Sequence, residues 1–346
     1  METKELKDCA ADLWEAARML HDGQVVGIPT ETVYGLAADA RNPQAVAQVF
    51  AAKGRPADNP LIVHIASMEQ LTEIAAEVPP LAKRLAEQFW PGPLTMILPK
   101  QASIPEITSG GLDTVGIRMP SHPVARALIR LSGVPIAAPS ANISGYPSPT
   151  TAAHVMRDMQ GKIAAVVDGG PCTVGVESTV ISLEGADTVR ILRPGYVTKE
   201  MLESVATHVS LDPAILHQLK EGQTVRSPGM KYKHYAPKVD MILIEGDNEK
   251  MSSSIKKILH KYENEGKKVG LLVSDEVANE LNHQNTFSYG SQENLAQIAS
   301  EIYEGLRYFD DKDVDIILAQ GTTDKGIGLA IMNRLHKASG FNSIFI

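Results

Sequence analysis

The sequence predicts an α/β protein, with a twisted mixed sheet and packed helices followed by a smaller three-layer, Rossmann-like α/β domain. The chain has 346 residues, which is long for a single hydrophobic core. Hydrophobic residues (43%) and charged residues (21%) occur in the proportions of a globular protein. Strand-like and helix-like segments alternate irregularly up to residue 205 and regularly after residue 238, which indicates two different sheets.

We predict a first domain over 1–205, a linker over 206–238 and a second domain over 239–346. The linker contains the run SPGMKYKHYAPK, which has no clean hydrophobic period. A plain linker would have little use for two tyrosines, a histidine and three lysines in so short a run. We therefore expect this run to act as a lid over a site.

The opening stretch is expected to hold two helices and two strands. A helix over 4–22 ends at an Asp-Gly pair, because glycine suits a helix C-terminus. The apolar strand 25–28 follows. Pro43 suits the first turn of a helix over 44–52, and the apolar run 61–65 is rich in residues that favour strands.

The remainder of the first domain interleaves helices and strands. Ser121 and Thr150 are predicted to cap helices, because their hydroxyls accept hydrogen bonds from free backbone N–H groups. The helices are expected at 68–77, 80–89, 122–131 and 198–206, with one more after Thr150. The strands are expected at 94–98, 114–118, 135–138, 164–167, 178–183 and 188–192.

The second domain shows a regular alternation, which predicts helices packed against a sheet. Its strands are expected at 239–244, 268–273 and 314–319, and its helices at 249–263, 292–308 and 327–338. The last helix follows the Gly-rich turn GTTDKGIG, a pattern that suits an anion but is also an ordinary helix entry.

Charge and cysteine content restrict the class of protein. The net charge is −8, which argues against a protein whose whole task is to bind nucleic acid. Cys9 and Cys172 offer neither a disulfide framework nor a zinc spacing. The N-terminal stretch lacks the pattern of a signal peptide, and no apolar run approaches the roughly 20 residues of a membrane span. We expect a cytoplasmic protein.

Two neighbouring segments, VVGIPTETVYGLAADA and KGRPADNPLIVHI, predict an anionic small-molecule site. Lys53 and Arg55 are candidates for phosphate, because lysine offers a point charge and arginine a bidentate fork. The alternative is a solvated pair at a helix end. His64 lies on a strand, where a lone histidine is more often part of the core than a ligand.

Three further segments carry candidate residues. Arg118 ends an apolar strand, so it needs an anionic partner, either a substrate carboxylate or a glutamate or aspartate of the chain. Pro139–Asn142 follows a strand and offers a serine and an asparagine, although these are also turn residues. Ser178 and Thr179 offer hydroxyls, although an ordinary strand start explains them as well.

Several familiar chemistries are missing, since HExxH, paired CxxC, GxSxG, a dinucleotide fingerprint and a P-loop are absent from the sequence. Cations, hydroxyls and one or two carboxylates remain. These suit nucleotidyl or phosphoryl transfer, in which catalysis is mostly positioning and charge stabilisation.

Taken together, the motifs resemble the threonylcarbamoyl-AMP synthase family. The matching residues are PTETVYGLA, KGRPADNPL, His64, Gly116-Ile117-Arg118, PSANISG and Glu177-Ser178-Thr179. Lys53/Arg55 and Ser140/Asn142 match the family's Lys-x-Arg and Ser-x-Asn signature. The run SPGMKYKHYAP resembles the linker of its two-domain members, so the resemblance covers essentially the whole chain.

The resemblance implies a reaction in which L-threonine, bicarbonate and ATP give L-threonylcarbamoyl-adenylate and pyrophosphate, for modification of an adenosine next to the tRNA anticodon. It makes the first domain catalytic and implies Mg²⁺ carried by ATP, a downstream tRNA-modifying transferase as partner, and tRNA contact. The implied catalytic residues are Lys53 and Arg55, with Glu31 and Glu177 as helpers. The implied threonine-binding residues are Thr32, His64, Arg118, Ala138 and Ser178. The implied ATP-binding residues are Arg55, Asn59, Thr114, Ser140, Asn142, Ser148, Arg193 and Tyr235.

Three other functions stay open at this point. An RNA-binding module is one, although the acidic net charge argues against RNA as its sole purpose. A related enzyme that uses carbamoyl phosphate is the second, although such relatives carry zinc-binding cysteine pairs. A regulatory threonine sensor is the third, although a sensor would not need the Lys-x-Arg site.

Overall fold

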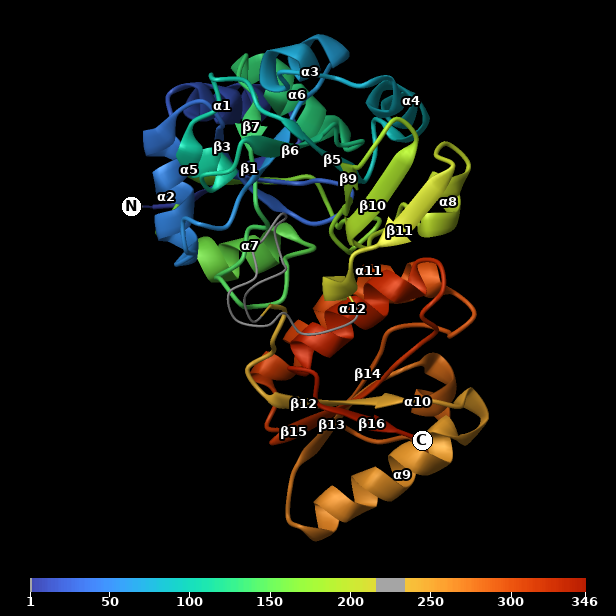
Figure 1. Cartoon of the computed structure of the whole chain (residues 1–346). Coiled ribbons are helices and arrows are strands. Elements are labelled where there is room, and N and C mark those ends of the chain that lie inside the picture. The colour runs from blue at the N-terminus through green and yellow to red at the C-terminus, as the bar shows by residue number, and fades with distance from the viewer. Residues whose placement is uncertain (1, 216–233) are drawn as a thin grey trace. The chain divides into compact units, whose positions relative to one another are not determined.

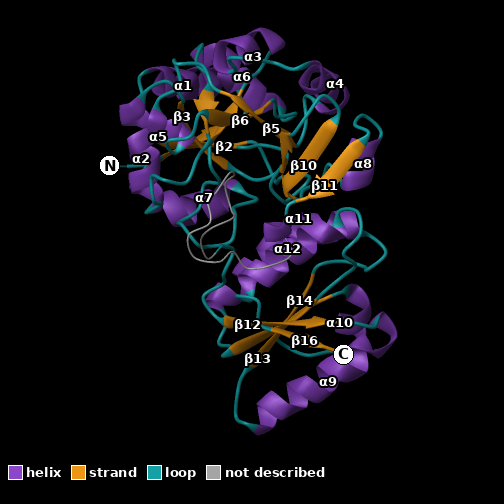
Figure 2. Ribbon diagram, in the orientation of Figure 1, coloured by secondary structure: helices purple, strands orange, loops and turns teal. Residues whose placement is uncertain are grey.

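The computed structural model describes residues 2–215 and 234–346, which belong to two compact units (Figure 1). The first unit comprises Met1–Ser144 and Ser148–Lys231, and the second comprises Gly145–Pro147 and Tyr232–Ile346. Both units combine helices with a sheet, which confirms the predicted α/β class (Figure 2). No helix within 2–215 or 234–346 is long and apolar enough to cross a membrane.

The first unit contains a mixed sheet of eleven strands, in the order β1-β8-β2-β3-β7-β4-β6-β5-β9-β10-β11. The strands are β1 (Lys4–Lys7), β2 (Val26–Ile28), β3 (Gly35–Asp39), β4 (Ile62–His64), β5 (Leu94–Pro99), β6 (Thr114–Arg118), β7 (Ile136–Ala137), β8 (Ala165–Asp168), β9 (Thr179–Leu183), β10 (Thr188–Arg193) and β11 (His208–Leu211). In its middle, β4 runs parallel to β6, and β5 runs antiparallel to β6 and parallel to β9. The ends of these short strands therefore meet in one part of the sheet.

Helices pack against this sheet through narrow apolar stripes. They are α1 (Ala10–His21), α2 (Pro43–Lys53), α3 (Met68–Ile74), α4 (Pro80–Phe89), α5 (Glu106–Ser109), α6 (Pro123–Ser132), α7 (Ala152–Met159) and α8 (Lys199–Glu203), with a 3₁₀ turn at Pro213–Ile215. Leu20 of α1 and Leu128 of α6, for example, share one buried cluster with Val26 and Val167 of the sheet. Burial of such side chains is the main favourable term in forming this layer.

The structure corrects three local predictions. Residues 4–7, expected to open a helix, form β1 and pair with β8, because the alternating pattern buries only Leu6 and the pairing supplies backbone hydrogen bonds that a frayed helix end lacks. His122, not Ser121, caps α6 through its Nδ1, and Thr151, not Thr150, caps α7 through its hydroxyl. In both places two neighbouring polar residues could cap the helix. The residue that directly precedes the first helical turn is the one that caps it.

The linker region is only partly described. Residues 208–211, which fall in the predicted linker 206–238, form β11 and pair with β10 of the first unit's sheet. The predicted lid residues up to 233 lie outside the described residues. His234–Lys238 belong to the second unit.

The second unit is a parallel sheet between two layers of helices, as predicted (Figure 2). Its strands β12 (Asp240–Glu245), β13 (Val269–Val273), β14 (Thr286–Ser288), β15 (Ile316–Gln320) and β16 (Ser343–Phe345) have the order β14-β13-β15-β12-β16. The helices are α9 (Asn248–Asn264), α10 (Asp275–Leu281), α11 (Leu295–Tyr308) and α12 (Gly328–Ala338), with a 3₁₀ turn at Phe309–Asp311. Every residue of β13 is buried, as expected for a parallel strand covered on both faces. The short elements β14, β16 and α10 were not predicted from the sequence.

Gly195 follows β10 at a position that leaves no room for a side chain. A Cβ atom at this position would lie 2.4 Å from the backbone nitrogen of Thr179 and 2.6 Å from the carbonyl oxygen of Glu177. Backbone atoms in a sheet cannot move aside easily. The glycine therefore lets the chain after β10 pass directly against the residues that precede β9.

We predict that Gly195→Ala lowers the free energy of unfolding by about 1–3 kcal/mol, because the added methyl group overpacks the backbone around Ser178. Gly185→Ala is the matched control, since a Cβ there meets only ordinary contacts, at 3.7 Å and beyond. Urea unfolding followed by circular dichroism would compare the two variants. Equal stability of both would contradict the close approach at Gly195.

Candidate active site

Three polar side chains form a row across the middle of the first unit's sheet. Arg118 of β6 is in register with His64 of β4 on one side and with Thr95 of β5 on the other. Residues in register on neighbouring strands point to the same face of a sheet. All three are buried. The sheet thus places a cation, an imidazole and a hydroxyl side by side on one face.

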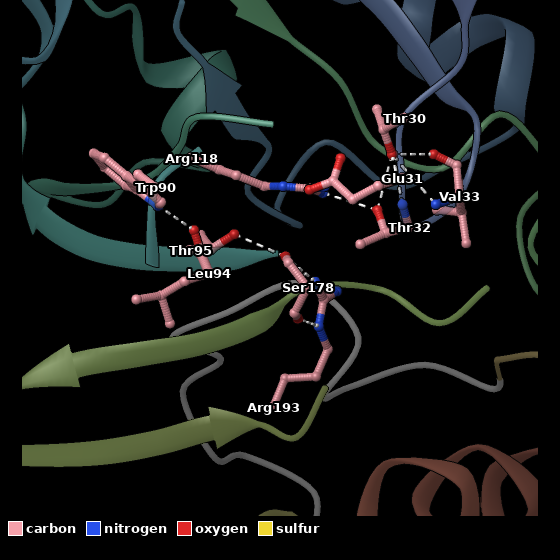
Figure 3. Close-up of polar contacts among 10 residues, drawn as sticks. All are labelled: Thr30, Glu31, Thr32, Val33, Trp90, Leu94, Thr95, Arg118, Ser178 and Arg193. Atoms are coloured by element: carbon pink, nitrogen blue, oxygen red, sulfur yellow. Dashed lines mark hydrogen bonds and ion pairs between the residues drawn. The ribbon is translucent and has the colours of Figure 1, made fainter. Parts of the chain in front are cut away.

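Arg118 has its charge partner in the loop after β2. Its Nη2 lies 2.7 Å from Oε1 of Glu31, and its Nη1 donates a hydrogen bond of 2.9 Å to Oγ1 of Thr32 (Figure 3). The two charged side chains are 4% and 7% exposed. Of the two kinds of partner expected for Arg118, the structure therefore shows a glutamate of the chain. The buried Nε of Arg118 makes no hydrogen bond to any described residue, so one donor of the fork is still open.

Burial and charge set the protonation of this cluster. Burial alone would raise the pKa of the Glu31 carboxyl, but the charge and hydrogen bond of Arg118 outweigh it and hold the pKa below its ordinary value. For His64, burial and the nearby Arg118 charge lower the pKa to about 3. His64 is therefore neutral at neutral pH, and its Nδ1 donates to the carbonyl oxygen of Ile62, 3.2 Å away.

A second buried network surrounds Ser178, just before β9. The hydroxyl oxygens of Ser178 and Thr95 are 2.8 Å apart. Arg193, at the end of β10, donates from Nη2 to the Ser178 hydroxyl and from Nε to the Ser178 carbonyl oxygen, both at 3.1 Å. Figure 3 shows the side chains of Thr95 and Arg193 meeting at Ser178. The network joins two residues with predicted binding roles, Ser178 for threonine and Arg193 for ATP.

Lys53 joins the two halves of the Lys-x-Arg and Ser-x-Asn signature. It is the last residue of α2, is 3% exposed, and donates to the carbonyl oxygens of Ser140 and of Asn142, the latter at 2.7 Å. A solvated pair at a helix end is thereby excluded for Lys53. Its ammonium group holds the loop after β7 in place, because three N–H donors can bind several carbonyl oxygens at once.

Arg55 and Asn59 lie in the turn between α2 and β4. Nη2 of Arg55 donates to the carbonyl oxygen of Pro60 at 3.2 Å, which shapes this turn. Asn59 is buried, and its Oδ1 makes no hydrogen bond to any residue that the structure describes. An unpartnered buried acceptor is costly unless a ligand completes it. The turn therefore offers a buried acceptor that a bound ligand could satisfy.

The other predicted residues occupy separate places. Ser148 is buried and donates a 2.5 Å hydrogen bond to Oε1 of Glu177. The backbone N–H of Ala138 donates to the carbonyl oxygen of Ile62, beside the strand of His64. Thr114 starts β6, at the opposite end of the strand from Arg118. Tyr235 belongs to the second unit, where its ring packs against Tyr303 with ring centres 5.4 Å apart, so its part in ATP binding stays a prediction.

Sequence reasoning missed Thr95 and Tyr34. Thr95 is the one polar side chain in the run Leu94–Leu98, an interruption that marks it, although only the sheet register shows that it adjoins Arg118. The Tyr34 hydroxyl donates to the carbonyl oxygen of Gly170 at 2.7 Å and accepts from the N–H of Gly169 at 3.2 Å. It ties two loops together, and burial raises its pKa. No signal in the sequence indicates that pairing.

We predict an acid sensitivity that depends on His64. Its pKa is about 3 in the folded state and about 6.5 when unfolded, so between these values only the unfolded chain takes up the proton, and stability falls as pH falls. From pH 7 to pH 5 the loss is about 2 kcal/mol. Urea unfolding at both pH values should show this loss in the native chain but not in His64→Gln. Equal losses in both chains would contradict a buried neutral histidine.

Comparisons with known proteins cover both units. Residues 18–195 match the family model described as "Telomere recombination", and residues 197–340 match the model "Threonylcarbamoyl-AMP synthase, C-terminal domain". The threonylcarbamoyl-AMP synthase of Pyrococcus abyssi is 49% identical over 329 residues, 95% of this chain and 94% of the relative. That of Bacillus subtilis is 48% identical over 341 residues, 98% and 96% of the two chains.

The fold agrees with these matches. The crystal structure of P. abyssi Sua5 complexed with L-threonine superposes with a TM-score of 0.94, at 46% identity and over 100% of both chains. Sequence and fold thus agree from one end of the chain to the other. The chain belongs to the two-domain threonylcarbamoyl-AMP synthase family.

Proposed function

We propose that this chain forms L-threonylcarbamoyl-AMP from L-threonine, bicarbonate and ATP, with release of pyrophosphate, for threonylcarbamoyl modification of the adenosine next to the tRNA anticodon. It is an enzyme of the nucleotidyltransferase type. The observation that carries this conclusion is the match over nearly the whole chain to synthases at 48–49% identity. The buried cations and hydroxyls of the first unit provide the groups that such a reaction needs.

L-Threonine binds along the ends of β4 and β6, where His64 and Arg118 lie side by side. Arg118 receives the carboxylate, because its buried Nε is an open donor and a carboxylate suits its planar fork. The neutral His64 adds no positive charge that would repel the α-amine. Thr32, the backbone of Ala138 and Ser178 supply the remaining contacts. This site is built from five segments that the sheet brings together.

ATP binds beside it, on strand ends and adjoining loops. The residues proposed to hold it are Arg55, Asn59, Thr114, Ser140, Asn142, Ser148, Arg193 and Tyr235. The unpartnered Oδ1 of Asn59 supports this role, since a ligand donor would complete it. Lys53 contributes positive charge near the phosphates and carbamate, while its hydrogen bonds to the loop of Ser140 and Asn142 keep that loop in position.

The chemistry proceeds in two steps. Bicarbonate takes up a proton and loses water to give CO₂, and the threonine amine adds to CO₂ to form a carbamate. The proton that the amine nitrogen gives up replaces the one that bicarbonate consumed. A carbamate oxygen then attacks the α-phosphorus of ATP, and the bond to pyrophosphate breaks. The protein aligns the reacting groups and stabilises charge, which together can supply much of the rate enhancement. The low exposure of Lys53, Arg118 and Ser178 also keeps water away from the labile carbamate.

Mg²⁺ enters with ATP in this proposal. No group of three or more His, Cys, Asp or Glu side chains among the described residues converges to hold a metal ion. Mg²⁺ commonly uses one or two carboxylates together with substrate phosphates and water. Glu177 fits that need, since its carboxylate is hydrogen-bonded to Ser148, a predicted ATP ligand. When bound, the ion neutralises phosphate charge.

The cellular setting follows from the chemistry. Carbamoyl-adenylates are short-lived, so a tRNA-modifying transferase must take over the product close to where it forms. We infer that such a transferase is the downstream partner, that tRNA contact is transient, and that the enzyme works in the cytoplasm, where its substrates are. The acidic net charge of −8 agrees with RNA contact being secondary.

The reaction is tested by measuring pyrophosphate release from ATP, with threonine and bicarbonate each omitted in turn. We expect release only when both are present, and a product whose mass is that of threonylcarbamoyl-AMP. Release with threonine alone, under CO₂-free conditions, would instead indicate an aminoacyl-adenylate. Absence of release under every condition would contradict the proposal.

We predict that Arg118→Ala raises the KM for threonine roughly 10- to 100-fold and that for ATP less than about 3-fold, because charged hydrogen bonds to the carboxylate are lost. Arg190→Ala is the matched control, since Arg190 is an arginine of the same sheet, paired with Glu184 and partly exposed. Steady-state kinetics with each substrate varied in turn provides the measurement. Equal effects on both substrates would exclude a carboxylate clamp.

A further inference from the structure

We propose that Thr95 is a positioning residue that fixes the direction of the Ser178 hydroxyl proton, so that Ser178 acts toward L-threonine as a hydrogen-bond donor only. This inference rests on the proposed function, in which Ser178 contacts threonine. It assigns a role to Thr95, which is completely buried. The protons and lone pairs in the network around Ser178 determine this role.

The position of Thr95 is set by the sheet. It is in register with Arg118 on β6 and with Val180 on β9, two residues beyond Ser178. Its hydroxyl oxygen is 2.8 Å from that of Ser178 (Figure 3). Its methyl group points to Gly116, where a Cβ atom would approach it to 3.2 Å. Thr95 thus packs with its methyl group and bonds with its hydroxyl.

The Ser178 hydroxyl offers one proton and two lone pairs. Arg193 can only donate, so its Nη2, at 3.1 Å, occupies one lone pair. Nε of Arg193 donates to the Ser178 carbonyl oxygen, which fixes the orientation of the guanidinium group. The hydrogen bond to Thr95 then decides whether Ser178 has a proton or a lone pair left for a ligand.

The surroundings of the Thr95 hydroxyl decide which of the two hydroxyls donates in the bond between Thr95 and Ser178. Within the described residues Ser178 is its hydrogen-bond partner, and Thr95 is 0% exposed. If Ser178 donated to Thr95, the proton of Thr95 would be buried without an acceptor, which is unfavourable. If Thr95 donates, its buried proton has an acceptor and both lone pairs of Ser178 are used. The Ser178 proton is then the one group left over, and the threonine that the proposed function places beside Ser178 supplies its acceptor.

A donor-only hydroxyl recognises an acceptor on the substrate and rejects a donor. The α-amine of threonine cannot serve, because it presents protons before the reaction. The carboxylate can serve, and Arg118, which binds it in the proposed function, is the direct neighbour of Thr95 on the sheet. We infer that Ser178 donates to the threonine carboxylate and that Thr95 and Arg193 together impose this polarity.

The test compares Thr95→Val with Thr95→Ser. Valine keeps the shape of threonine and removes the hydroxyl, whereas serine keeps the hydroxyl and removes the methyl group. Thr179→Val is the matched control, because Thr179 is an adjacent, completely buried threonine whose hydroxyl donates to the Val197 carbonyl oxygen instead. Threonine binding without ATP is measured by calorimetry, and both KM values by pyrophosphate release.

We expect Thr95→Val to weaken threonine binding about 5-fold, the order of one lost hydrogen bond, with the KM for ATP changed less than 2-fold. Thr95→Ser and Thr179→Val should bind threonine like the native chain, even where the melting temperature falls. Native affinity in Thr95→Val, or an equal loss in Thr179→Val, would overturn the proposal.

A double-mutant cycle shows whether Thr95 acts through Ser178. In a Ser178→Ala background, Thr95→Val should cause no further loss of threonine affinity, whereas a purely structural effect would persist. If Thr95→Val does not fold, Thr95→Ala takes its place in the same cycle, and a persisting loss would again overturn the proposal. If instead the native chain neither binds threonine nor releases pyrophosphate, the proposed function itself fails, and the role of Thr95 fails with it.

Discussion

The buried ion pair between Arg118 and Glu31 is the interaction on which the site of the first unit depends. A guanidinium group with 4% exposure is stable only if a carboxylate compensates its charge, and Glu31 lies 2.7 Å away to do so. Removing one member of such a pair typically costs 3–5 kcal/mol, because the other is left buried and unpaired. The loop after β2 must therefore lie against the end of β6, and the threonine side of the site is built around that constraint.

The same constraint recurs with the other buried cations. Lys53 is compensated by carbonyl oxygens of the loop after β7, and Arg193 by the hydroxyl and carbonyl of Ser178. Lys53 thereby connects two segments that lie far apart in the chain, and Arg193 connects the end of β10 to the residue before β9. Because each partner comes from a strand end or an adjoining loop, the short strands of this sheet define the geometry of the site more than its helices do.

This arrangement suits a reaction that needs alignment more than a reactive side chain. A neutral His64, an Arg118 paired with Glu31 and hydrogen-bonded hydroxyls form the threonine side of the site. Preorganised dipoles and charges of this kind stabilise a developing negative charge without reorganising during the reaction. The buried surroundings make each of these interactions stronger than it would be in water.

Taken alone, the sequence determined the α/β class, most strands and helices, and nearly all the candidate residues. It did so because apolar periodicity and ordered motifs such as PTET, Lys-x-Arg and Ser-x-Asn are local features of the chain. Only the tertiary structure decided that residues 4–7 form a strand, that Glu31 is the partner of Arg118, that Lys53 binds the Ser140–Asn142 loop and that Thr95 adjoins Ser178. Each of these depends on strand register between segments distant in sequence, and pairing partners are selected by the free energy of the whole sheet and not by any local pattern.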